Sequence, residues 1–352
     1  YFEGGQMVKK EMDKDHDGKP DLTLFYEKGK LKRQEVSAER KGRTDVWYFY
    51  DPKGQIERKE QDTNGDGKPD IRVMYENKQP VRSEEDKNYD GQFERVVLFK
   101  AGKVARIEED TDGRGKTDTW SYFEGGQMVK KEMDKDHDGR RDVVGYYRDG
   151  DLERQEEDLN GDGTMDRVLT FAGGELARKE ESIQRNGTFD LIDIYSEGSL
   201  IRRFRDTNGD GEFDNLYGFT DNQLVQQERD TNGDGYFDLR VLYKNGRRVR
   251  QEADTNRDHR VDVWVIYKDS KKIQQDEDRN YNGKIDARYF FQDDQVKKQE
   301  RVAEKEPTPQ PAPFSSTQKE LSRPDEVHGG ELEKVKRVVE TVQKPFSDMR
   351  VQ

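Results

Sequence analysis

The stretch DTNGDGYFD at Asp230–Asp238 sets the pattern of the chain, because close copies of these nine residues recur at intervals of 24 residues. Twelve such units fill residues 12–300, with one inserted residue near Pro52. A fixed period of this length indicates a repeat architecture, in which each unit is stabilised by packing on its neighbours rather than by one central core. We number the nine-residue loops one to twelve in chain order, and their residues as positions 1 to 9.

Oxygen-bearing side chains occupy positions 1, 3, 5 and 9 of the loops, and glycine at position 6 permits a sharp turn that points these oxygens inward. Nine loops keep this set in full or nearly so. Their candidate metal ligands are Asp13, Asp15, Asp17 and Asp21; Asp62, Asn64, Asp66 and Asp70; Asp86, Asn88, Asp90 and Glu94; Asp134, Asp136, Asp138 and Asp142; Asp158, Asn160, Asp162 and Asp166; Asp206, Asn208, Asp210 and Asp214; Asp230, Asn232, Asp234 and Asp238; Asp254, Asn256, Asp258 and Asp262; and Asp278, Asn280, Asn282 and Asp286.

This spacing resembles the first nine residues of the EF-hand calcium loop, in which position 7 supplies a backbone carbonyl and position 9 often acts through water. Oxygen-only ligands suit a hard divalent ion, and six or more of them favour calcium over magnesium. The alternative is that these Asp/Asn/Gly runs are only turns between strands. Shorter turns would serve that purpose, however, and four clustered carboxylate-type groups repel one another without a cation. We therefore predict Ca²⁺ as the cofactor, at about nine sites.

The loops depart from the EF-hand at position 12, where a bidentate glutamate is replaced by residues such as Leu24 or Val241 inside a following strand. A glutamate two residues before the loop is a candidate substitute, yet Phe204 holds that place before the intact ninth loop. The candidate substitutes are Glu60, Glu84, Glu132, Glu228 and Glu252. With a weaker ligand set we expect dissociation constants of roughly 10⁻⁴ to 10⁻³ M, the range of extracellular modules.

Each segment between two loops reads as a β-hairpin. In the tenth unit Leu239, Val241 and Tyr243 alternate with other residues, and Asn245-Gly246 predicts a type I′ turn before the return strand. We predict an all-β fold: a repetitive antiparallel β-hairpin meander of about twelve 24-residue repeats, in a single-layer coiled or superhelical sheet with the calcium loops along one edge. The pattern also resembles MORN-type hairpin repeats, which implies a long single sheet.

Two columns of side chains support an open sheet. The last residue of each first strand is aromatic in all twelve units and is expected to pair across the hairpin with an aliphatic residue, as Tyr26 with Leu31. The return strand carries a basic column, which two facing sheets would bury at high cost. This column consists of Arg33, Arg58, Arg82, Arg106, Lys130, Arg154, Arg178, Arg202, Arg250 and Lys298.

A longer period of three units is superimposed on the 24-residue repeat. The second, fifth and eighth loops lack the ligand set, and the eleventh has His259 in place of glycine. Trp47, Trp120 and Trp264 share one strand position in three of these four units. We interpret the coincidence as a superunit of three hairpins, with every third hairpin turned inward and its tryptophan packed; the alternative is an exposed aromatic row for sugar or protein contact.

Composition excludes several classes of function. Hydrophobic residues make up 29% and charged residues 40% of the chain, so a thick two-layer core is not expected. The net charge of −13 belongs to the loops and is poor evidence for a basic partner; no nucleic-acid partner is expected. There is no cysteine, no apolar run long enough to span a membrane, and no catalytic motif. His16 and His137 are expected to be solvated rather than catalytic.

The ends differ from the repeats. Residues 1–11 read as the second half of a unit, and residues 1–18 are identical to residues 122–139, which indicates a recent duplication and more repeats upstream. A signal peptide or lipid anchor before Tyr1 stays open. Residues 301–326 read as a proline-rich linker, and residues 327–352 as a tail with a short amphipathic helix at 331–344 that docks on the sheet or on a partner.

The loops resemble those of bacterial exported calcium-binding repeat proteins, and also thrombospondin type 3 and dockerin loops. The resemblance covers residues 12–300 and implies a non-enzymatic protein that is extracellular or in the cell envelope, in the periplasm or on the outer membrane surface. Our leading hypothesis is a scaffold or filament subunit stiffened by Ca²⁺, which associates with itself or a protein partner through sheet edges and the C-terminal segment. The alternative is a calcium-dependent adhesin that binds a glycan or surface polymer.

Overall fold

The computed structural model describes residues 1–37 and 43–302, which form an all-β structure. The chain divides into two compact units, residues 1–163 and residues 164–352. The strands of the first unit are β1 (Phe2–Glu3), β2 (Gln6–Met7), β3 (Lys9–Met12), β4 (Leu22–Glu27), β5 (Lys30–Val36), β6 (Val46–Tyr50), β7 (Ile56–Gln61), β8 (Ile71–Glu76), β9 (Gln79–Glu85), β10 (Arg95–Lys100), β11 (Lys103–Glu109), β12 (Thr119–Glu124), β13 (Gln127–Met133), β14 (Val143–Arg148) and β15 (Asp151–Glu157).

The second unit contains twelve strands in its described residues. They are β16 (Arg167–Ala172), β17 (Glu175–Glu181), β18 (Leu191–Ser196), β19 (Ser199–Arg205), β20 (Asn215–Thr220), β21 (Gln223–Arg229), β22 (Leu239–Lys244), β23 (Arg247–Ala253), β24 (Val263–Lys268), β25 (Lys271–Glu277), β26 (Ala287–Gln292) and β27 (Gln295–Arg301).

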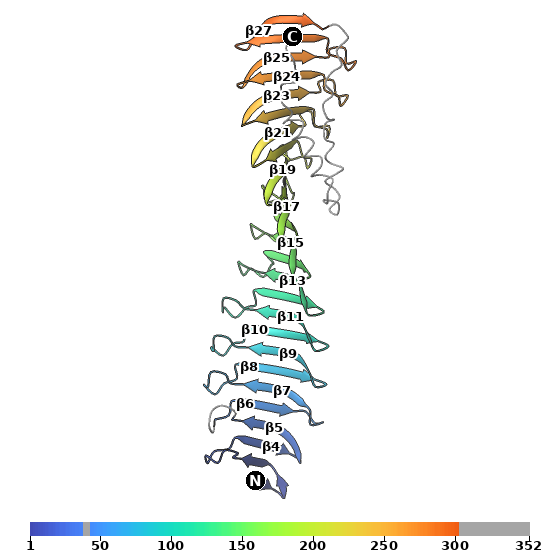
Figure 1. Cartoon of the computed structure of the whole chain (residues 1–352). Helices are drawn as coiled ribbons and strands as arrows, with labels where there is room; N and C mark the ends of the chain where they lie inside the picture. The colour runs from blue at the N-terminus through green and yellow to red at the C-terminus, as the bar shows by residue number, and fades with distance from the viewer. Residues whose placement is uncertain (38–42, 303–352) are drawn as a thin grey trace. The chain divides into compact units, whose positions relative to one another are not determined.

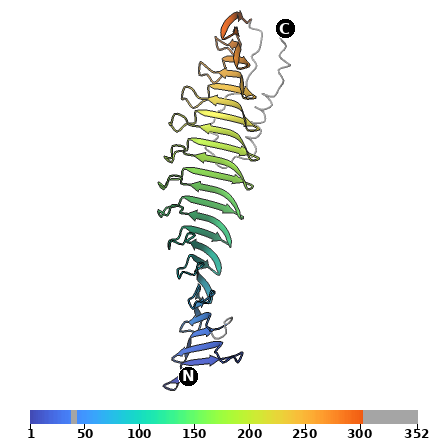
Figure 2. The ribbon, with the colours of Figure 1, turned by 90° about the vertical axis from the view of Figure 1, so that its left-hand side faces the viewer.

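The strands confirm the predicted meander, which does not close into a barrel. Consecutive strands pair antiparallel from β3 to β15 in the first unit and from β16 to β27 in the second, as β21 with β22 and β22 with β23. The loops lie along one edge of each unit and the tight hairpin turns along the other (Figures 1 and 2). The repeat period thus places chemically equivalent loops side by side.

The hairpin turns have the predicted type I′ geometry. Asn245 and Gly246 both have positive φ, at 53° and 73°. The predicted aromatic–aliphatic pairs form, including Tyr26 with Leu31 and Phe291 with Val296. A register shift next to the aromatic residue, between Leu242 and Tyr243 in this hairpin, was not predicted. Such a bulge increases the local twist and places one more residue on the return strand.

The two faces of the sheet differ in chemistry. In the tenth unit Arg240 lies opposite Glu252, and Leu242 opposite Arg250. We call the face that bears these residues, and their equivalents in other units, the Arg–Glu face. The opposite face bears Val241 and Gln251 and is called the aliphatic face.

Hydrophobic packing occurs on the Arg–Glu face. In the second unit Ile192, Ile194, Phe204, Leu216 and Phe237 form one buried cluster. Two of the three tryptophans, Trp120 and Trp264, are buried, so the packing interpretation is confirmed for both. The three-hairpin superunit itself remains a prediction.

The remaining expectations for the ends of the chain are not addressed by the fold. The linker at 301–326 and the helix at 331–344 fall outside the described residues, apart from Arg301 and Val302. Within residues 1–37 and 43–302, no helix is long and apolar enough to cross a membrane.

Candidate metal centres

Apart from the second loop, which includes residues outside the described ranges, each loop is wound by two left-handed residues. Position 6 has positive φ, as at Gly67 (92°) and Gly211 (90°), which glycine adopts without steric cost. Position 4 also has positive φ, at His16, Tyr89, His137 and Arg257. The positive φ at position 4 was not predicted from the sequence. Together the two turns reverse the chain within nine residues and bring both ends of the loop to the edge of the sheet.

The aspartate at position 1 is the anchor of the loop. In the third loop Asp62 accepts hydrogen bonds from the N–H groups of Gly65 (2.5 Å) and Gly67 (2.9 Å). The same pair of bonds recurs in most loops, for example at Asp86 and Asp206. These are charge-assisted hydrogen bonds to an ionised acceptor, so they fix the carboxylate toward the interior of the loop.

The aspartate at position 9 closes the loop and continues the sheet. Asp70 is only 2% exposed and accepts hydrogen bonds from the backbone N–H and the hydroxyl of Thr63. Its carbonyl oxygen accepts the N–H of Asp86, the first residue of the next loop, at 2.8 Å. The side chain therefore faces the loop while the main chain pairs with the next repeat.

Several loops bring three acidic side chains to one place. Ligand oxygens lie within 4.8 Å of one another in the first, third, fourth and sixth loops. The groups are Asp13, Asp15 and Asp17; Asp62, Asp66 and Asp70; Asp86, Asp90 and Glu94; and Asp134, Asp136 and Asp142. These clusters could hold a metal ion; the predicted ligands Asp21 of the first loop and Asp138 of the sixth are not among the grouped residues.

Four of the other five loops, the ninth to the twelfth, do not show this convergence among the described residues. In the part of the second unit that the structure describes, no three carboxylates or imidazoles meet the same limit. The ninth to twelfth loops carry an amide at position 3, as at Asn208, but so do the convergent third and fourth loops, at Asn64 and Asn88, so this position does not explain the difference. The seventh loop divides between the two units at Gly163 and Thr164. Metal binding by these five loops stays a prediction.

The sixth loop contains a buried acceptor that no protein group satisfies. Asp134 is 5% exposed; its Oδ2 accepts the N–H of Gly139, while its Oδ1 has no hydrogen-bond partner. An unpaired buried oxygen on a charged group is costly, at about 1–3 kcal/mol or more. A cation at the Asp134, Asp136 and Asp142 cluster would supply the missing partner.

In the tenth and eleventh loops, burial and neighbouring carboxylates raise the pKa of the aspartate at position 9. Burial raises the pKa of Asp238 above its usual value, and the nearby carboxylates of Asp230 and Asp234 raise it further, against hydrogen bonds from Thr231. Burial and the Asp254 carboxylate likewise raise the pKa of Asp262. A bound cation would reverse this repulsion by favouring the charged forms.

The glutamates considered as substitutes for position 12 have other partners. Glu60 and Glu84 both pair with Arg72, and Glu132 pairs with Arg141. Glu228 and Glu252 both pair with Arg240. They belong to the ion pairs of the Arg–Glu face rather than to the metal clusters, so the predicted substitution is not supported. The bulge in each hairpin, which the composition of the strands does not reveal, decides which residues of its two strands share this face.

The basic column is also paired. Most of its members lie beside an acidic residue two positions later on the same strand, such as Arg33 with Glu35 (2.8 Å) and Arg154 with Glu156 (2.7 Å). Several also lie over aromatic rings, as Arg58 over Phe49. The column is therefore half-exposed, as an open sheet requires, but its charge is largely compensated.

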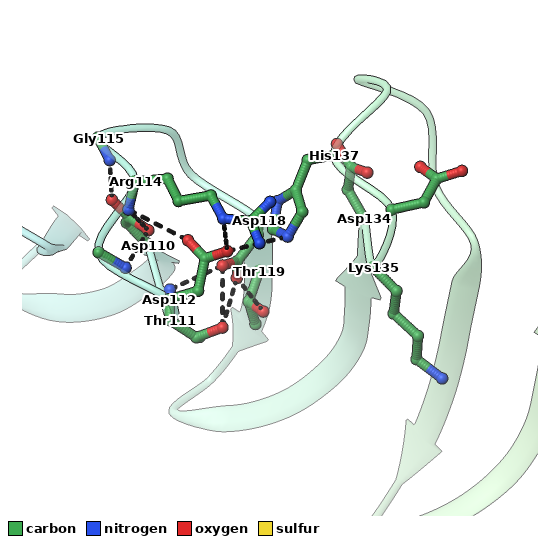
Figure 3. A network of polar contacts seen from close by, with 12 residues as sticks. Asp110, Thr111, Asp112, Arg114, Gly115, Asp118, Thr119, Asp134, Lys135 and His137 are labelled. Carbon is green, nitrogen blue, oxygen red and sulfur yellow. Dashed lines mark hydrogen bonds and ion pairs between the residues drawn. The ribbon is translucent and has the colours of Figure 1, made fainter.

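One polar cluster was missed by the sequence reasoning. His137 was expected to be solvated, yet its Nε2 lies 3.0 Å from Oδ2 of Asp112 in the preceding loop (Figure 3). Asp118 joins them in a group whose ligand atoms lie within 4.8 Å. The signal was present in the register, because position 4 of one loop adjoins position 3 of the loop before it.

Comparisons with known proteins give no relative. No family model and no curated protein matches the chain. A structure of accessory secretory proteins 1, 2 and 3 from Streptococcus pneumoniae is 20% identical over 32% of this chain and 19% of that chain, with a TM-score of 0.22. A TarM mutant of S. aureus is 14% identical over 38% and 21% of the two chains, at 0.18.

A third solved structure, TcdB2-TccC3, is 13% identical over 76% of this chain and 16% of that chain, with a TM-score of 0.20. The chain thus spans no more than 21% of the length of these neighbours. TM-scores this low carry no functional argument. The functional proposal therefore depends on the loops alone.

Proposed function

We propose that this protein is a non-enzymatic structural repeat protein whose loops bind Ca²⁺, and that it acts outside the cytosol as a scaffold or filament subunit. The observation that carries the proposal is the convergence of acidic oxygens, repeated in four loops, around positions fixed by backbone hydrogen bonds. The orphaned Oδ1 of Asp134 adds an acceptor that a cation would satisfy.

Calcium fits these clusters better than softer metals. The groups in the first, third, fourth and sixth loops offer only carboxylate oxygens, the ligands preferred by hard cations. Without an ion, the repeated carboxylates along one edge of each unit repel one another. Filling the loops would remove this repulsion and hold each loop rigid, so that calcium stiffens the ribbon repeat by repeat.

The expected Ca²⁺ affinity of the loops favours a location outside the cytosol. With a dissociation constant of roughly 10⁻⁴ to 10⁻³ M, loops of this kind fill at the millimolar calcium of extracellular fluid and stay empty in a cytosol. At about 10 mM calcium each filled site would contribute about 1.4–2.7 kcal/mol to the free energy of unfolding. We therefore place the protein in the extracellular space or the cell envelope.

A scaffold role also requires association. Strand β27 pairs with β26, and six of its seven residues are exposed, including Val296. An exposed edge strand with free N–H and C=O groups is a template for strand addition from another chain. The adhesin alternative is less well supported, because the basic column is compensated by glutamates and Trp120 and Trp264 are buried.

The proposal is tested by counting bound ions in a matched pair of variants, Asp134→Asn and Asp110→Asn. Both residues are position-1 aspartates that accept a hydrogen bond from the glycine N–H at position 6, and both variants lose the same charge. Of these two loops, the sixth has aspartate at positions 1, 3, 5 and 9, whereas the fifth carries Arg114 at position 5.

Native mass spectrometry in millimolar calcium should show one Ca²⁺ fewer in Asp134→Asn and no change in Asp110→Asn. Equal counts in both variants and the unaltered protein would show that the sixth loop is a turn without a metal, and the proposal would lose its main support.

A further inference from the structure

The fifth loop, Asp110–Asp118, cannot be a calcium site of the same design as its neighbours. Position 5 is Arg114, whose guanidinium Nε lies 2.8 Å from Oδ2 of Asp112. The anchor Asp110 still accepts the N–H groups of Gly113 and Gly115, so the loop keeps its shape. Besides the anchor it therefore presents two acidic residues, Asp112 and Asp118, in a loop whose position 5 no longer offers an oxygen ligand.

A histidine from the next repeat completes a different set of donors. His137 extends from the sixth loop toward Asp112 (Figure 3). Oxygens of Asp112 and Asp118 and a ring nitrogen of His137 all lie within 4.8 Å of one another. Ligands around a tetrahedral ion at about 2.0–2.2 Å are roughly 3.3–3.6 Å apart, so small side-chain rotations would bring these atoms into range.

We propose that Asp112, Asp118 and His137 bind a divalent transition metal, with Zn²⁺ as the representative ion. Imidazole nitrogen is a ligand for zinc, copper and nickel, whereas calcium takes oxygen donors. Two carboxylates with one imidazole therefore select a softer ion than the carboxylate clusters of the first, third, fourth and sixth loops. Three protein ligands leave a fourth position for water.

The surroundings suit a site that fills from solution. Asp118 is 3% exposed and is held by the N–H and hydroxyl of Thr111, which fixes one ligand before the metal arrives. The side chains of Asp112 and His137 are 29% and 22% exposed, so an ion can reach them. The metal would join two consecutive repeats, because its ligands come from both the fifth and sixth loops.

The competing arrangement is an ion pair without metal. In the structure Oδ2 of Asp112 faces both Arg114 and His137. Metal binding needs the ring nitrogen free of a proton and the arginine displaced; Arg114 is 67% exposed, so its guanidinium can move into solvent. The two states are mutually exclusive, which makes Arg114 a competitor for the site.

The chain contains a matched control for His137. Residues 13–18 have the same sequence as residues 134–139, so His16 occupies an identical loop. In the part of the chain that the structure describes, no metal-ligating group includes His16, and its Nδ1 lies 3.2 Å from the carbonyl oxygen of Lys14. His137→Gln thus changes this loop where carboxylates face the histidine, and His16→Gln changes the same loop sequence where, among the described residues, no such group forms.

The test titrates the full chain with Zn²⁺ by calorimetry, and with Co²⁺ as a spectroscopic probe, both in millimolar calcium. We expect one Zn²⁺ equivalent in the unaltered protein and in His16→Gln, and a loss of affinity of about 10–100-fold or more in His137→Gln. NMR with Co²⁺ should show paramagnetically shifted imidazole signals that disappear in His137→Gln. Arg114→Ala should bind Zn²⁺ more tightly than the unaltered protein.

Equal zinc binding by His137→Gln and the unaltered protein would overturn the proposal, as would equal losses in His16→Gln and His137→Gln. Repeating the titration without calcium separates this site from the proposed function. A zinc equivalent in this titration, together with no bound Ca²⁺ by native mass spectrometry in millimolar calcium, would leave this site standing while the calcium proposal fails. Bound Ca²⁺ with no zinc equivalent would do the reverse.

Discussion

The buried ion-pair triad of the tenth unit provides a prediction with an internal control. Arg240 donates hydrogen bonds to Glu228 at 2.6 Å and to Glu252 at 3.1 Å. The three side chains are 7%, 0% and 4% exposed. Arg72 forms the same triad with Glu60 and Glu84 at 3.1 and 2.9 Å, but its side chain is 29% exposed.

Replacing the arginine by methionine removes the cation and keeps most of the volume. In Arg240→Met the buried carboxylates of Glu228 and Glu252 would lose the cation that they share and keep only the Gln226 amide and Arg250 as partners. Removing one partner from a buried pair costs about 3–5 kcal/mol. Glu228 is 0% exposed, so solvent cannot readily replace the lost cation. In Arg72→Met the glutamates are more accessible, and we expect a cost of about 1 kcal/mol or less.

Urea unfolding at neutral pH in millimolar calcium, followed by circular dichroism and tryptophan fluorescence, measures both free energies. Trp264 lies opposite Glu252 across the β23–β24 pair and reports on the tenth and eleventh units. Equal effects of the two variants, or a stable Arg240→Met protein, would refute the reasoning that burial sets the strength of these triads. The triple variant with Glu228→Gln and Glu252→Gln should recover part of the loss, because the two buried carboxylates are then neutral; the cation left without its glutamate, Arg250, is 25% exposed.

Three further predictions concern packing, backbone strain and pH. Trp120→Ala and Trp264→Ala should each lower the free energy of unfolding by about 3–5 kcal/mol in denaturant titrations, and unchanged stability in either variant would contradict the packing interpretation. Gly91→Ala, at φ 94° with open space around the added methyl group, should cost about 1–2 kcal/mol through strain alone, whereas Gly218→Ala in strand β20 should cost little; equal melting temperatures would contradict this. Burial alone would raise the pKa of Glu181, but Lys179 and Arg167 outweigh burial and hold this pKa below the usual 4.5. The charged form of Glu181 therefore stabilises the fold above pH 4.5, and this contribution is lost as the pH falls through the lowered pKa. Glu181→Gln should therefore lower stability by about 0.5–1 kcal/mol at pH 7 and by much less near pH 3, and a pH-independent difference would count against the ion pair.

The repeat and its local chemistry were predictable because they depend on residues close in sequence. The 24-residue period, the turn at Asn245-Gly246 and the pairing of Tyr26 with Leu31 follow from local pattern and turn geometry. Contacts between repeats were not predictable in the same way. They depend on the pairing of strands across each loop, which has no register shift and sets Glu228 opposite Arg240, whereas the bulge decides which residues share a face within one hairpin.

The candidate sites show the same division. Ligands within one loop, such as Asp62, Asp66 and Asp70, were identified from spacing, since nine residues fix their geometry. Groups from two loops were misjudged: the glutamates before each loop bind arginines of adjacent strands, and His137 approaches Asp112 of the preceding loop. Register between repeats, rather than composition, determines these contacts.

The central claim is that the loops are structural calcium sites, and thermal unfolding tests it most directly. The unaltered protein would be melted in excess EDTA and in millimolar calcium while circular dichroism is recorded, with bound metal counted by mass spectrometry. The account predicts a large calcium-dependent rise in melting temperature with about nine ions per chain, one for each intact or nearly intact loop. Identical melting curves with no bound metal would contradict it, because the loops would then be only turns between hairpins.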